Sequence, residues 1–130
     1  MLIAVDERDP RPLYAQIVAG IKEEIRRGRL LPGEGLPSVR ELAEALGLNL
    51  HTVHHAYRLL RDEGVIHLRL GRRARVAPLR EKKAGRGEVE ARLGSRLREL
   101  ATEAFHLGLS PEDFRALVDE VLGKHPRRIR

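Results

Sequence analysis

The sequence lacks residue types that several kinds of protein need. It has no cysteine and no tryptophan, and it has only two tyrosines and two phenylalanines among 130 residues. The absence of cysteine excludes disulfide bridges, cysteine-ligated zinc, iron–sulfur clusters and thiol nucleophiles. Because aromatic side chains are so few, a hydrophobic core must consist of Leu, Ile, Val and Ala, which favours helices.

The sequence also lacks a long apolar run. No stretch of about 18 apolar residues is present that would span a membrane. The apolar start of the chain leads into Asp6, Glu7 and Asp9, whereas a signal peptide carries basic residues beside its apolar segment. We therefore expect a cytoplasmic protein, neither secreted nor inserted in a membrane. The length predicts one compact domain or a small domain with an appendage.

Basic side chains are in excess. The chain has 25 Lys and Arg against 19 Asp and Glu, which gives a formal net charge of +6. The excess is concentrated in residues 64–87, which hold eight basic side chains and one acidic side chain. Such a concentration is typical of a surface that binds phosphate groups. A solvated basic surface that binds nothing is the alternative.

The first half of the chain shows three helical segments. Apolar residues with helical spacing predict a first helix over residues 13–28. Ser38 and Glu41 form a capping box, which starts a second helix of about nine residues. Asn49 then caps a third helix over residues 50–63. A turn of only three or four residues between the second and third helices is typical of a helix-turn-helix.

Alternating apolar and basic residues follow the third helix. This pattern predicts a β-hairpin over residues 66–76 with a two-residue turn at 71–72. Arg69, Arg73 and Arg75 fall on its basic face. The residues expected on its apolar face are Ile66, Leu68, Leu70, Ala74 and Val76.

The order of these elements predicts the fold class: mostly α with a small β-hairpin, as an N-terminal winged helix-turn-helix followed by a short two-helix dimerisation module. The DNA-binding domain would occupy residues 1–78, a basic linker 79–87 and the C-terminal helical module 88–130. The third helix fits the major groove of double-stranded DNA. The hairpin arginines would lie along phosphates or enter the minor groove.

The two helices of the C-terminal module have too little interior to bury both of their apolar stripes. A symmetric homodimer would cover them and would place two reading heads about 34 Å apart on a palindromic operator. Packing onto the first helix of the same chain is the alternative. The residues assigned to dimerisation are Leu93, Leu97, Leu100, Phe105, Phe114, Leu117, Val118 and Val121.

Several short segments of residues 10–77 form a recognisable pattern. They are Pro12-Leu13-Tyr14, Gln16-Ile17, Pro32-Gly33, Leu36-Pro37-Ser38-Val39-Arg40-Glu41-Leu42-Ala43, Thr52-Val53 and Ala56-Tyr57. This pattern resembles the DNA-binding domain of the GntR family. Asn49, the Ala56-Tyr57 pair and the short C-terminal module are similar to the YtrA-type branch in particular. The resemblance implies a dimeric bacterial regulator, usually a repressor and often of a transporter operon.

By position, the resemblance places DNA contacts on Arg40, Leu50, His51, Thr52, His54, Leu70 and Gly71. Leu50 and His54 stand where many relatives have Arg, so we expect base readout to differ here. His51, Thr52, His55 and Arg58 are the expected substitutes. The complete predicted DNA-binding set is Ser38, Arg40, Asn49, Leu50, His51, Thr52, His54, His55, Arg58, Arg69, Gly71, Arg72, Arg73 and Arg75.

Other interpretations of these residues are weaker. His51 and His55 have the i, i+4 spacing of a metal-binding pair, but no carboxylate partner is evident, so we expect DNA contact or solvation and no metal. Arg40 could instead pair with Glu44 one turn away. No catalytic nucleophile or cofactor site is present, and we expect no enzyme activity and no cofactor.

We therefore predict a sequence-specific transcriptional regulator, a homodimeric repressor. One alternative is a non-specific architectural protein that binds nucleic acid through the same basic surface. Another is an interaction module whose winged domain docks a protein partner. The C-terminal module shows no convergent polar groups that would form a pocket for a small-molecule effector.

Overall fold

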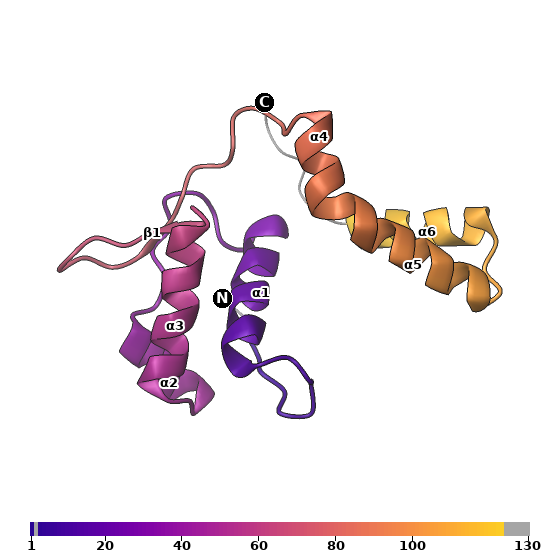
Figure 1. Cartoon of the computed structure of the whole chain (residues 1–130). Helices are drawn as coiled ribbons and strands as arrows, with labels where there is room; N and C mark the ends of the chain where they lie inside the picture. The colour runs from indigo at the N-terminus through magenta and orange to yellow at the C-terminus, as the bar shows by residue number, and fades with distance from the viewer. Residues whose placement is uncertain (2, 124–130) are drawn as a thin grey trace. The chain divides into compact units, whose positions relative to one another are not determined.

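The computed structural model describes residue 1 and residues 3–123 and contains two compact units, Met1–Leu79 and Arg80–Arg130 (Figure 1). The first unit holds helices α1 (Leu13–Arg26), α2 (Val39–Leu46) and α3 (Leu50–Asp62) and strands β1 (Ile66–His67) and β2 (Arg75–Val76). The mostly helical fold with a small antiparallel sheet is therefore confirmed. The end of the predicted C-terminal module, residues 124–130, lies outside the described residues.

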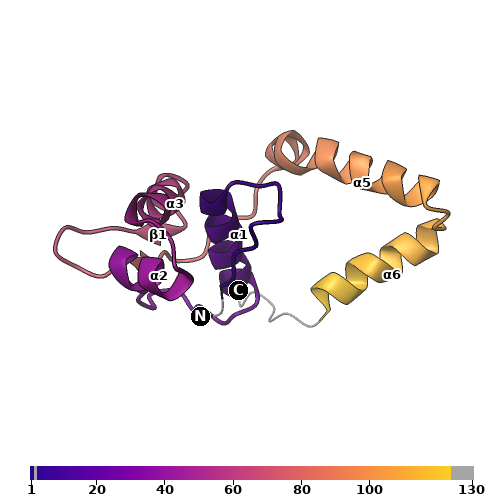
Figure 2. The same cartoon turned by 90° about the horizontal axis from the view of Figure 1, so that it is seen from below.

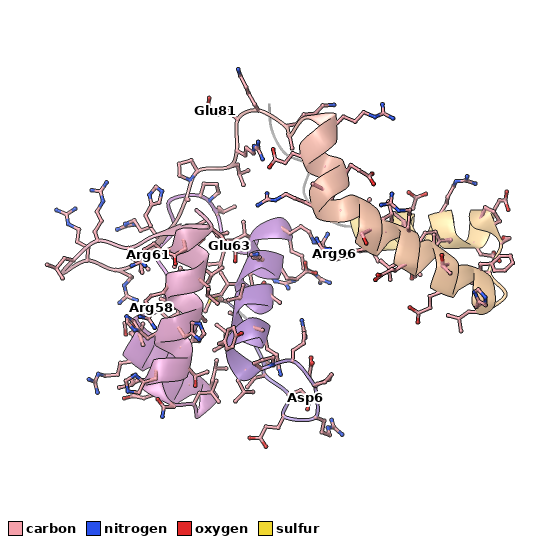
Figure 3. The ribbon with its side chains drawn as sticks, viewed as in Figure 1. Asp6, Arg58, Arg61, Glu63, Glu81 and Arg96 are labelled. Carbon is pink, nitrogen blue, oxygen red and sulfur yellow. The ribbon has the colours of Figure 1, made fainter. Side chains whose placement is uncertain are left out.

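Helices α1 and α3 lie side by side and point the same way. The Tyr14 ring near the start of α1 contacts the His55 ring of α3, and Lys22 Nζ lies 2.5 Å from Glu63 Oε1 at the end of α3. Figure 3 shows Glu63 between the two helices. The core that they enclose is aliphatic apart from one tyrosine: Ile17, Ile21, Leu30, Leu36, Leu42, Ala43, Val53, Ala56, Tyr57, Leu60, Ile66, Ala74 and Val76.

The predicted caps of α2 and α3 are confirmed. The Glu41 backbone N–H donates to Ser38 Oγ at 3.0 Å, and the Ser38 N–H donates to Glu41 Oε1 at 2.8 Å. Helix α2 ends at Gly47, which has a φ of +67°. Glycine suits this position because a residue with a Cβ rarely adopts this left-handed conformation. The Asn49 side chain then accepts from the His51 N–H at 2.7 Å and starts α3. A tight helix-turn-helix results.

The wing is the loop with its two flanking strands, residues 66–76, and it projects away from the helices (Figure 1). Ile66 pairs with Val76 and His67 with Arg75, so the strands are shorter than predicted. The outer part is a loop that closes with a bond from the Arg72 N–H to the Arg69 carbonyl at 3.0 Å.

The predicted position of the wing turn is wrong by one residue. Leu70 and Gly71 are the central residues, and Gly71 takes the positive φ of +73° that the second central position of such a turn requires. A turn centred on Gly71 and Arg72 would be closed by a bond from the Arg73 N–H to the Leu70 carbonyl, whereas the bond that forms runs from Arg72 to Arg69. Leu70 is consequently fully exposed at the tip instead of joining the apolar face.

The second unit is helical. Helix α4 (Arg86–Val89), a π-helical turn (Glu90–Gly94) and α5 (Ser95–His106) follow one another without a break, and α6 (Pro111–Leu122) comes after a short turn. Arg86 and Gly87, placed in the linker by the sequence, are helical. The Arg80 guanidinium, which donates twice to the Glu88 carboxylate, lowers the Glu88 pKa and holds the segment ahead of α4.

Helices α5 and α6 meet at their connecting turn and diverge from it (Figure 2). They leave their apolar faces largely uncovered, and Ala104 is the one buried apolar side chain among the described residues of this unit. The inward packing that their periodicity predicts is not formed among the described residues of this unit. The exposed side chains are Val89, Leu93, Leu97, Leu100, Phe105, Leu107, Leu117, Val118, Val121 and Leu122, and Phe114 is half-buried.

One buried hydrogen bond generates a first prediction. The Tyr57 hydroxyl of α3 donates to the Pro37 carbonyl at 2.6 Å, and burial raises the Tyr57 pKa. We expect Tyr57→Phe to lower the free energy of unfolding by about 1 kcal/mol, because the Pro37 carbonyl loses its partner. Urea denaturation followed by circular dichroism measures the change.

Tyr14→Phe is the matched control. The Tyr14 hydroxyl makes no hydrogen bond within the described chain, and its ring contact with His55 survives the change. Equal losses of stability in the two variants would contradict the importance assigned to the Tyr57 bond.

Candidate nucleic-acid interface

The first turns of α2 and α3 lie next to each other and form a shallow hollow of about 430 Å³. Five of its six lining residues were predicted to contact DNA. The sixth, Val39, was missed, although an apolar residue beside Arg40 on a capped first turn is a usable signal. The lining residues are Ser38, Val39, Arg40, Leu50, His51 and His54.

Four of the predicted arginines carry guanidinium groups that make no ion pair or hydrogen bond within the described part of the chain. All four side chains are exposed, and Figure 3 shows Arg58 on the side of α3 away from α1. The alternative pairing of Arg40 with Glu44 is therefore not formed. A guanidinium group without a partner in the protein is available to donate hydrogen bonds to a phosphate or to the edge of a guanine. These residues are Arg40, Arg58, Arg69 and Arg72.

Arg73 and Arg75 are engaged within the protein. Arg73 Nη1 donates to the Leu36 carbonyl at 3.0 Å and to Glu41 Oε1 at 2.9 Å, and Arg75 Nη1 donates to the Gly33 carbonyl at 2.9 Å. The Glu41 pKa is lowered, first by the N–H bond from Ser38 and then by Arg73. These contacts tie the wing to α2 and to the preceding loop. A DNA contact by either arginine stays a prediction.

The same loop also pairs with β2 through its backbone. The Gly33 N–H donates to the Val76 carbonyl at 2.8 Å, and the Leu36 N–H donates to the Ala74 carbonyl at 2.8 Å. Gly35 forms an isolated antiparallel bridge with Arg75. Strand β2 is thus paired with β1 on one edge and with this loop on the other. The loop at the tip of the wing makes no such bond to another described element.

The expected outward position of His55 is wrong. The His55 ring lies 4.2 Å from the Tyr14 ring, centroid to centroid, and is half-buried between α3 and α1. On an isolated helix this position points away from the core, but α1 runs along that flank of α3. His51 and His54 stay exposed in the hollow, and Thr52 is half-buried. Among the described residues no group of three or more His, Cys, Asp or Glu side chains could hold a metal ion.

The remaining predicted residues have local positions. Ser38 and Asn49 use their side-chain oxygens as helix caps. Gly71 lies at the tip of the wing.

None of the helices in the described ranges is long and apolar enough to cross a membrane.

Comparison with known proteins identifies the family of this chain. The model of the gntR family of bacterial regulatory proteins matches residues 13–76, from the start of α1 to the end of β2. The HTH-type transcriptional repressor YtrA of Bacillus subtilis (strain 168) is 32% identical over 120 residues, which cover 92% of each chain. The chain belongs to the GntR family. Proteins of this family are transcription regulators and not enzymes.

Solved structures agree with this assignment. A transcriptional antiterminator from Listeria monocytogenes EGD-e superimposes with a TM-score of 0.83 at 28% identity, over 100% of this chain and 98% of its own. AraR(DBD) in complex with operator ORX1 superimposes with a TM-score of 0.51 at 27% identity, over 59% of this chain and 93% of its own. GntR regulators bind DNA operators, and this member carries the same winged helix-turn-helix.

Two neighbouring wing arginines provide a second prediction. We expect Arg72→Ala to lower the salt dependence of binding to a random duplex by about one phosphate contact without changing stability. Arg73→Ala is expected to destabilise the fold, because it releases the Leu36 carbonyl and Glu41. Fluorescence anisotropy over a salt series and thermal denaturation separate the two effects. An Arg73→Ala protein as stable as the natural one would show that the bonds of Arg73 to the Leu36 carbonyl and to Glu41 are not needed for the fold.

The lowered pKa of Glu41 leads to a third prediction, on pH. A carboxyl group whose pKa falls on folding stabilises the native state above its unfolded pKa, and this contribution is lost as the pH drops through the folded value. Glu41→Gln should therefore be less stable than the natural protein at pH 7, with a difference that shrinks below pH 4.5. Urea denaturation at several pH values measures this.

Glu44→Gln, on the same helix, is the control. The Glu44 side chain makes no hydrogen bond or ion pair with the described residues, so its replacement should give no such pH-dependent difference. A difference for Glu41→Gln that stays constant from pH 7 to pH 3 would contradict the assigned contacts.

Proposed function

We propose that this GntR-family regulator is a homodimeric repressor that binds a palindromic operator. In this proposal the helices of the second unit form the dimer interface. The apolar faces that α5 and α6 leave uncovered carry the proposal. Contiguous exposed apolar surface of this kind marks an interaction site, and its position after the DNA-binding unit is what a dimeric regulator needs.

The geometry between α5 and α6 supports a second copy as the occupant. An open apolar cavity of about 290 Å³ lies at the turn between the two helices, lined mainly by Ala101, Ala104, Phe105, Leu109, Pro111 and Phe114. Phe105 is 73% exposed at its edge. In a two-fold dimer each copy would offer the same face and fill the partner's cavity with its own apolar side chains.

The proposed dimer predicts the form of the operator. A two-fold axis through the second units repeats α3 and the wing once in each half-site, so the operator would be palindromic, with half-site centres one helical turn apart. We infer repression because the Bacillus subtilis relative YtrA is a transcriptional repressor. The resemblance to the YtrA-type branch further suggests a transporter operon as the target.

The apolar face supplies a fourth prediction. We expect the natural protein to have the mass of two chains in light scattering, and Leu97→Glu to have the mass of one, because a carboxylate on this face would be buried without a partner. Thr102→Glu, on the opposite side of α5, adds the same charge and should leave the dimer intact. Leu97→Glu should also lose most of its affinity for the palindrome, since each reading head then binds alone.

Footprinting on duplexes tiled across the chromosome around the gene, with excess random DNA, tests the operator. Protection of an inverted repeat by two chains supports the proposal, and the genes beside it identify the operon. A monomer that protects an asymmetric site contradicts the dimer. Equal competition by random DNA indicates the non-specific architectural protein instead.

A further inference from the structure

The hollow between the first turns of α2 and α3 has an apolar interior. Its walls are the side chains of Val39 and Leu50, the first residues of the two helices, and Leu50 is 43% exposed. The polar groups of Arg40, His51 and His54 lie around it. The hollow therefore combines an apolar floor with a polar, partly cationic rim on the surface that binds DNA.

An exposed leucine at the start of the reading helix has a restricted set of partners. Its side chain neither donates nor accepts a hydrogen bond, so it cannot pair with the polar edge of a base. In the major groove the one apolar group that a standard base pair presents is the 5-methyl group of thymine. An arginine beside it suits a guanine or a phosphate on the neighbouring nucleotide.

We propose that Leu50 and Val39 form a specificity pocket for the 5-methyl group of one thymine in each operator half-site. This inference rests on the proposed function, because it needs a defined operator. Leu50 lines this pocket from α3 and Val39 lines it from α2. Cytosine lacks the methyl group and is discriminated against at this position.

The local structure holds the pocket open before DNA arrives. Val39 is half-buried and packs against the hydrophobic core, so its side of the pocket cannot move independently of the core. The Ser38 and Asn49 caps fix the first turns that carry Val39 and Leu50. Affinity gained at a preformed pocket is not offset by the cost of ordering it.

The test begins with selection of bound sequences from a randomised duplex library by the full-length protein. Each thymine of the selected operator is then replaced by deoxyuridine, which removes the methyl group and changes no hydrogen bond. We expect one symmetry-related thymine pair to respond. The affinity should fall about fourfold for each methyl group lost, as for the burial of one methylene-sized group.

The variants assign this effect to the pocket. Leu50→Ala should reduce the thymine-to-uracil affinity ratio at that position to nearly one. Leu79→Ala, which shortens a leucine that is also 43% exposed, should keep the natural ratio. Leu50→Arg should change the selected base at this position to guanine, the partner of an arginine fork. The ratio compares two duplexes bound by one protein, so a loss of folded protein does not change it.

The outcomes separate the two proposals. If a palindrome is selected but uracil is tolerated at every position, the pocket inference is wrong and the repressor proposal stands. An unchanged ratio in Leu50→Ala also overturns the inference, because the methyl group is then read elsewhere. If no common sequence is selected, both proposals fail.

Discussion

The surface formed by the first turns of α2 and α3 depends on the hydrogen bond from the buried Tyr57 hydroxyl to the Pro37 carbonyl. Tyr57 belongs to α3, and Pro37 precedes the cap that starts α2, so this bond joins the recognition helix to the beginning of the helix before it. Two helices of 8 and 13 residues have little surface with which to fix their relative position. A directional bond in a largely apolar core supplies the fixed geometry that base recognition needs.

The capping box carries this order outward to the wing. Glu41 accepts from the Ser38 backbone and also from Arg73, and Arg73 bonds in addition to the Leu36 carbonyl. One carboxylate therefore connects the start of α2 with the β-ribbon more than thirty residues later. The helix pair and the wing, which are the two elements predicted to contact DNA, are therefore linked by the side chains of Glu41 and Arg73.

The sequence predicts the parts of the structure whose causes are local. The Ser38–Glu41 box, the Asn49 cap and the aliphatic core follow from residues a few positions apart, and the structure has them as expected. The position of the wing turn was missed because alternation fits either neighbouring register, and the bond from the Arg72 N–H to the Arg69 carbonyl decides between them. Sequence spacing likewise placed His55 outward, since a helical wheel contains no information about α1 beside it.

The candidate site divides in the same way. Its DNA contacts on α2 and α3 were assigned through the resemblance to the family, and they stay predictions; the structure shows that five of the assigned residues line one hollow. The bracing contacts of Arg73 and Arg75 were not predicted, because an arginine in a basic hairpin gives no sign of which distant carbonyl it will meet.

The residues around the hollow have a further consequence for how such regulators diversify. Arg40, Leu50, His51 and His54 take no part through their side chains in the hydrogen bonds and ion pairs of the described structure, and their side chains lie outside the core. Replacing one helix-forming side chain by another at these positions therefore changes the free energy of folding little. After gene duplication, one copy can acquire a new set of target genes by substitution here, without passing through an unstable intermediate. In this proposal, stability and DNA sequence specificity are determined by different residues of the same two helices.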